Sequence, residues 1–79
     1  MSYCLFDLAL GQSGVIEEIL APFFIEERLH RLGLIRGTTI TPVEAAPLGS
    51  PRIYSYLHAR IAIRNDLAKK IKIKYVKKN

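Results

Sequence analysis

The hydrophobic and polar positions follow two different periods along this chain, and the first is helical. Within residues 24–34, Ile25, Leu29 and Leu32 recur at the spacing i, i+4, i+7, which places them on one face of an α-helix. Gly33, directly after Leu32, can adopt the left-handed conformation that ends helices. The pattern predicts a short helix that ends at Leu32 or Gly33.

The second period is the alternation of a β-strand, and it begins at residue 53. Tyr54 and Tyr56 share one face of this strand. A single strand over residues 53–63 would be long for a small domain, so a tight hairpin turn is expected near His58–Ala59.

Three more strands are expected over residues 15–20, 38–44 and 71–76. Pro42 lacks an N–H group, so its strand should be an edge strand or carry a bulge. Asn65 is the expected N-cap of one helical turn before the last strand. About five short strands with one or two short helices predict a mostly β fold, a small and strongly bent β-barrel.

Composition fits one compact domain over residues 1–79, with 49% hydrophobic and 24% charged residues. A single cysteine, Cys4, leaves no internal disulfide and no cysteine zinc site, a pattern typical of cytoplasmic proteins. The apolar N-terminal stretch carries Asp7, stops at Gly11 and lacks a basic region, so neither a signal peptide nor a membrane span is expected.

The net charge of +5 is concentrated near the end of the chain, where lysines alternate with apolar residues. This permits an anionic partner, whether nucleic acid, a lipid surface or an acidic protein. Lysine on an outer strand face also serves solubility and protects a sheet edge. The residues expected to contact an anionic membrane surface are Lys72, Lys74, Lys77 and Lys78.

Catalytic motifs are missing from the sequence: it has neither a phosphate-binding glycine-rich loop nor a nucleophile elbow. We therefore expect no enzymatic activity and no cofactor. Glu26, Glu27 and His30 form one Glu-x-x-His pattern, whereas a di-iron site needs two copies and two further glutamates. A solvated charged face is expected there and no metal site, with a small iron-binding domain as the weaker hypothesis.

The segment "APLGSPR", residues 46–52, is the most specific feature of the composition. Its prolines restrict the backbone and its glycine frees it, so the loop can be rigid while its backbone groups stay exposed, which suits a binding surface. Leu48 at the tip either contacts a partner or folds back to cap the barrel. The predicted partner-binding residues are Pro47, Leu48, Gly49, Pro51, Arg52, Tyr54 and Tyr56, with the two tyrosines lining a peptide groove.

Three blocks in this order resemble the ferrous iron transport protein A (FeoA) family: "RLHRLGLIRGTT", the loop "APLGSP", and "AIRNDLA" before the last strand. The resemblance implies an SH3-like β-barrel that is cytoplasmic and non-enzymatic. It also implies binding to the membrane ferrous iron transporter FeoB, through the cytosolic region of that transporter, and modulation of its activity. A basic SH3-like nucleic-acid-binding domain is the less favoured alternative, and the edge strands of a small barrel would allow a homodimer.

Overall fold

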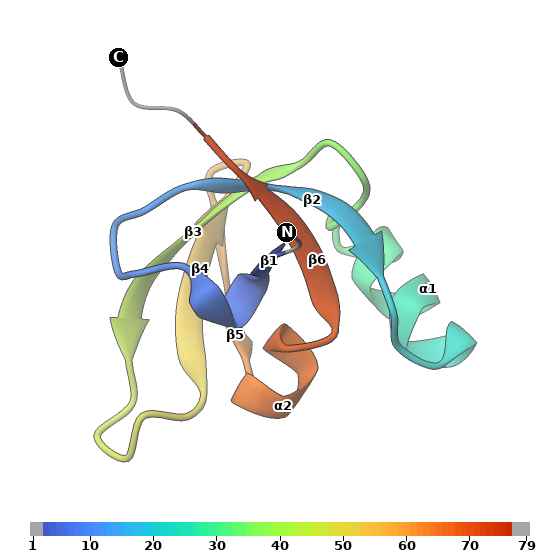
Figure 1. Ribbon diagram of the computed structural model, residues 1–79. Helices are drawn as coiled ribbons and strands as arrows, with labels where there is room; N and C mark the ends of the chain where they lie inside the picture. The colour runs from blue at the N-terminus through green and yellow to red at the C-terminus, as the bar shows by residue number, and fades with distance from the viewer. Residues whose placement is uncertain (1–2, 77–79) are drawn as a thin grey trace.

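The computed structural model describes residues 3–76 (Figure 1), so Lys77 and Lys78 of the predicted membrane contact lie outside the described residues. The strands are β1 (Tyr3–Cys4), β2 (Gly14–Ile19), β3 (Thr39–Ala45), β4 (Arg52–Tyr56), β5 (Ala59–Ile63) and β6 (Ile71–Tyr75). The helices are α1 (Phe23–Arg31), α2 (Asn65–Ala68) and the 3-10 turn η1 (Leu5–Asp7).

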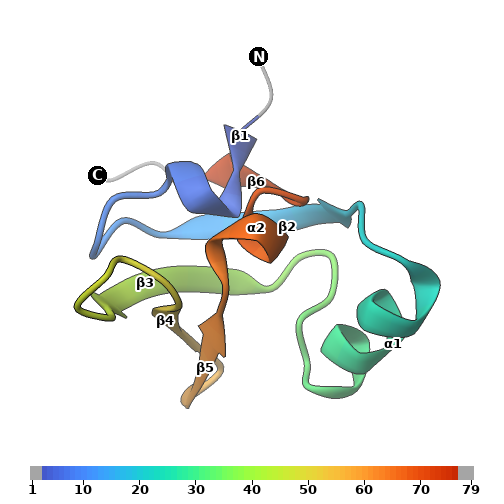
Figure 2. The ribbon, with the colours of Figure 1, turned by 90° about the horizontal axis from the view of Figure 1, so that it is seen from below.

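The described strands form one antiparallel sheet of six strands in the order β1-β6-β2-β3-β4-β5. The predicted mostly β fold is confirmed, with six strands in place of about five. The sheet bends strongly, but its order has two ends, so the hydrogen-bonded ladder is not closed into a barrel. Seen from below, β1 and β5 are the two edges, and α1 lies to one side of the sheet (Figure 2).

The end of α1 forms as the sequence predicts. Leu32 caps the helix, and Gly33 follows with a φ of 93°. The Gly33 N–H donates to His30 O and the Leu34 N–H to Leu29 O, which is the pair of hydrogen bonds that closes a Schellman motif. Leu29 and Leu34 are then buried together in the core.

The hairpin between β4 and β5 lies one residue earlier than expected. Its two-residue turn is Leu57–His58, with φ values of 43° and 65°. Two positive φ values in a two-residue loop match the right-handed twist of the flanking strands, and histidine tolerates this region better than β-branched residues do.

Pro42 behaves as its missing N–H requires. β3 lies between β2 and β4 and is not an edge, and its register with β4 shifts between Pro42 and Glu44, so the expected bulge is confirmed. The carbonyl of Pro42 accepts a hydrogen bond of 2.7 Å from Gly11 N–H, which ties the bulge to the loop before β2.

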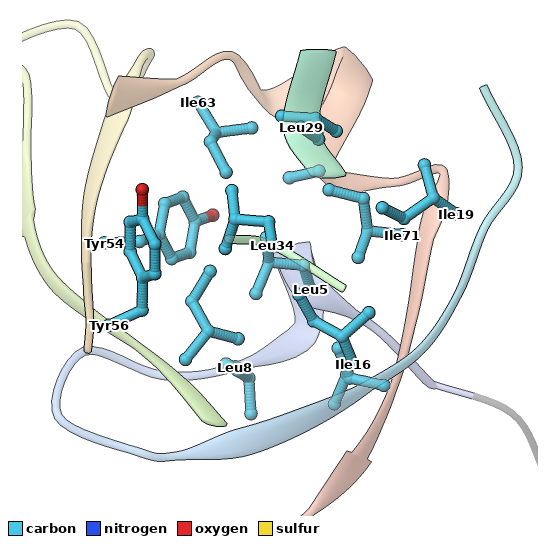
Figure 3. Packing of buried hydrophobic residues seen from close by; sticks show 13 residues of the cluster. Leu5, Leu8, Ile16, Ile19, Leu29, Leu34, Tyr54, Tyr56, Ile63 and Ile71 are labelled. Atoms are coloured by element: carbon cyan, nitrogen blue, oxygen red, sulfur yellow. The ribbon is translucent and has the colours of Figure 1, made fainter. Parts of the chain in front are cut away.

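The core lies on the concave face of the sheet and is closed by residues from α1, α2 and η1 (Figure 3). In β6, Ile71 and Ile73 are buried and Lys74 is exposed, as the alternation predicts. The buried cluster consists of Leu5, Leu8, Ile16, Ile19, Leu29, Leu34, Ile40, Tyr54, Tyr56, Ile63, Ala68, Ile71 and Ile73.

Candidate functional site

The loop between β3 and β4 is a compact turn. Gly49 N–H donates to Ala46 O at 2.7 Å, and Ala46 N–H donates to Pro51 O at 3.0 Å. Gly49 has a φ of 87°, a conformation that glycine adopts without strain, and the peptide bond before Pro51 is cis. The hydrogen bonds close the loop on itself, so its shape does not depend on side-chain packing at the tip.

A second set of contacts holds the loop against the start of α2. Asn65 donates from its side-chain Nδ2 to Gly49 O at 3.0 Å, and its backbone N–H donates to Ser50 Oγ at 3.2 Å. The expectation that Asn65 caps α2 is therefore wrong: Arg64 is the N-cap residue, and Asn65 is the first residue of the helix. Its side chain bridges two segments that are distant in sequence.

Leu48 stands at the tip of this loop with 97% of its surface exposed. The alternative in which Leu48 folds back to cap the barrel is therefore wrong. In Figure 1 the loop projects beyond the ends of β3 and β4, on the side of the molecule away from α1. A fully exposed leucine on a braced backbone is suited to insertion into an apolar depression of a partner.

Tyr54 and Tyr56 share a face, as expected, but it is the core face. They are 0% and 7% exposed, and both rings point into the buried cluster (Figure 3). The predicted tyrosine-lined groove is wrong, because alternation shows which residues share a face and not which face is inward. For the same reason these tyrosines offer no stacking platform to nucleic acid.

Arg52, the third predicted contact residue on β4, is also buried. Its guanidinium donates from Nη1 to Phe6 O at 3.1 Å and from Nη2 to Leu8 O at 2.6 Å. The same group lies 5.8 Å from the ring centre of Phe6 and 5.6 Å from that of Tyr54. Arg52 therefore fastens the N-terminal segment to β4, and the exposed role predicted for it is wrong.

The tyrosine hydroxyls differ in their surroundings. Tyr56 donates from Oη to Leu32 O at 2.9 Å, whereas the buried Tyr54 Oη finds no partner among the described residues. Burial raises the pKa of Tyr54 above its ordinary value, and the nearby Arg52 guanidinium offsets part of this increase. Tyr54 is thus neutral at physiological pH.

The charged groups singled out in the sequence lie on the surface. Lys74 is within 3.8 Å of Glu17, and Glu26 is within 3.8 Å of His30 on α1. Among residues 3–76, no three His, Cys, Asp or Glu side chains come together as a set that could hold a metal ion. Within the same range, no helix has the length and apolar character needed to cross a membrane.

Sequence reasoning missed one exposed feature, the aromatic pair at the start of α1. Phe23 and Phe24 are 75% and 73% exposed, and with Arg28 and Arg31 they line a shallow hollow. The sequence pattern indicated this exposure. In a helix that turns by about 100° per residue, both phenylalanines lie well away from the buried face that Ile25 and Leu29 define.

Comparison with known proteins identifies the family to which this fold belongs. A family model described as the FeoA domain matches residues 3–75. A fusion of Fe(2+) transport protein A with the Fe(2+) transporter FeoB in Porphyromonas gingivalis (strain ATCC BAA-308 / W83) is 29% identical over 73 residues. The match covers 92% of this chain and 9% of that relative, so the chain spans about a tenth of its length.

Two solved structures share the fold closely. The FeoA protein of Chlorobium tepidum has a TM-score of 0.91 at 25% identity, over 95% of this chain and 71% of that one. Stenotrophomonas maltophilia FeoA, a prokaryotic SH3 domain protein solved with zinc, has a TM-score of 0.76 at 29% identity, over 94% and 89%. The predicted SH3-like fold is confirmed, and with the family model matching nearly the whole length, this chain belongs to the FeoA domain family.

Proposed function

We propose that this protein is a small cytoplasmic, non-enzymatic accessory protein of ferrous iron uptake that binds and modulates a FeoB-like transporter. The observation that carries the proposal is the fusion of a homologous domain to FeoB in Porphyromonas gingivalis. Fusion holds two modules at a high effective concentration, which favours a contact between them.

The loop between β3 and β4 is the proposed contact surface, now reduced to Pro47, Leu48, Gly49 and Pro51. Two hydrogen bonds within the loop and two from Asn65 fix its backbone before any partner arrives. A preorganised loop avoids much of the ordering cost of binding, so one apolar anchor can contribute strongly. Arg52, Tyr54 and Tyr56 are buried and are no longer part of the proposed surface.

Complementation tests this proposal. A strain that lacks its own copy of the protein would receive the wild type, Leu48→Asp or Leu57→Asp, and ferrous iron uptake would be measured. Leu57 is a matched control because it is 67% exposed at the tip of a different hairpin. We expect Leu48→Asp to abolish ferrous iron uptake and Leu57→Asp to leave it unchanged. Full uptake with Leu48→Asp, at equal protein level, would remove the loop from the proposal.

A further inference from the structure

The edge of the sheet at β5 has unpaired backbone groups. β5 ends the strand order and pairs with β4 alone. Across the two-residue hairpin, Tyr56 and Ala59 form a hydrogen-bonded pair, so Ala59 and Ile61 direct their backbone groups toward β4. The N–H and C=O groups of Arg60 and Ala62 therefore point away from the sheet. No other part of residues 3–76 supplies a partner for them.

The two edges of the sheet differ in how well they are protected. β1 has two residues and offers little backbone for pairing, whereas β5 has five. Sheet edges are usually blunted by lysine, proline, a bulge or a covering element. β5 contains neither proline nor a recorded register shift, and Arg60 is its single charged residue. Of the two described edges, β5 is the one long enough to accept an added strand.

A groove of about 370 Å³ runs beside this edge, between β5, α1 and α2. Ile25 of α1 and Leu67 of α2 are partly buried against the core and leave the rest of their side chains facing the groove. The apolar lining is completed by small residues, and charged residues complete the rim. The lining residues are Ala21, Pro22, Ile25, Ala62, Arg64, Asp66, Leu67 and Lys70.

The rim of the groove carries more positive than negative charge. Arg64 lies 3.9 Å from Asp66, so one basic group is partly neutralised, while Lys70 is exposed. Arg60, exposed on β5 itself, adds a further positive charge beside the unpaired backbone. These charges complement an acidic segment. They oppose pairing with a second copy, which would bring arginines of both copies to one edge.

The positions of an added strand would alternate between the two faces of the sheet. Positions on the inner face would point toward Ile25 and Leu67, which favours apolar side chains. Positions on the outer face would lie beside Arg60, which favours carboxylates. We infer that the β5 edge binds an extended segment of alternating apolar and acidic residues, added as a further antiparallel or parallel strand. This surface is distinct from the Leu48 loop, and the inference does not depend on the identity of the iron transporter.

A peptide titration followed by NMR tests the inference on the full chain. The probe is a synthetic peptide of alternating valine and glutamate, and its control alternates valine with lysine. With the glutamate peptide, we expect the amide signals of Arg60 and Ala62 to shift and their hydrogen exchange to slow. Equal binding of both peptides, no binding of the glutamate peptide, or shifts confined to the Leu48 loop would each overturn the inference.

Ala62→Pro tests the backbone pairing most directly. It removes an N–H that faces the groove and leaves the hydrogen bonds to β4 intact. We expect about a tenfold or greater loss of peptide affinity with the urea midpoint nearly unchanged. Should the proline variant unfold, the Arg60→Glu, Arg64→Glu double variant takes its place. Its charge control is Arg36→Glu, which lies beside Glu17 and Glu18 and outside the groove. Affinity unchanged in the double variant would contradict the proposed charge preference and overturn the inference.

Discussion

Tyr54 and Tyr56 lie on the same face of β4 and should respond in opposite directions when each hydroxyl is removed. Tyr54 Oη is buried without a partner among the described residues, and such a group costs about 1 to 3 kcal/mol. Tyr54→Phe keeps the ring in the core and under Arg52, so we expect the free energy of unfolding to rise by about 1 kcal/mol. For a domain of this size, that raises Tm by roughly 4–8 °C.

Tyr56→Phe is the matched opposite change. It removes the 2.9 Å hydrogen bond to Leu32 O and leaves that carbonyl at the end of α1 without its side-chain donor. We expect a loss of about 1 to 2 kcal/mol. Urea unfolding followed by circular dichroism measures both variants against the wild type. If Tyr54→Phe destabilises the protein as much as Tyr56→Phe does, then the Tyr54 hydroxyl has a favourable interaction and the reasoning fails.

Three further predictions concern Arg52, Gly33 and Tyr54. Arg52→Met should lower the free energy of unfolding by about 3 kcal/mol in urea titrations, because two backbone carbonyls lose a charged donor; a change under about 1 kcal/mol would contradict the fastening role. Gly33→Ala should cost about 1 kcal/mol by thermal unfolding, since its φ is 93° and a new Cβ would meet Leu57 Cδ1 at 3.4 Å; an unchanged Tm would refute the strain. Because burial raises the pKa of Tyr54 in the folded state, the unfolded state releases this proton at lower pH, so the free energy of unfolding falls as the pH rises from about 10 through the raised pKa. Urea titrations from pH 8 to 11 should therefore show a steeper loss in the wild type than in Tyr54→Phe, and parallel curves would contradict the assignment.

Local sequence patterns predicted much of the fold. The spacing of Ile25, Leu29 and Leu32 and the glycine after them predicted α1 and the way it ends, because helix period and capping depend on neighbours a few residues apart. The bulge at Pro42 followed from one missing N–H. Both outcomes rest on rules that act within a single segment.

The candidate site was harder to predict because its decisive contacts span long sequence distances. Alternation grouped Tyr54 and Tyr56 correctly on one face, but which face is inward depends on how the sheet bends. Once the tyrosines turn toward the core, Arg52 must follow, and it finds its acceptors in the N-terminal segment. The contact of Asn65 with the loop joins residues 16 positions apart, which no local signal indicates.

The position of β5 at a sheet edge likewise depends on the whole topology. In sequence, residues 59–63 read as an ordinary strand after a hairpin. The strand order leaves one side of this strand without a partner. The groove beside it forms because α1 and α2 pack next to this edge.

Calorimetric titration of the purified cytosolic region of a FeoB-like transporter with this protein tests the central claim most directly. The account predicts measurable binding for the wild type and for Leu57→Asp, and at least about a tenfold weaker affinity for Leu48→Asp. Equal affinity for Leu48→Asp and the wild type, or no binding by the wild type, would contradict it.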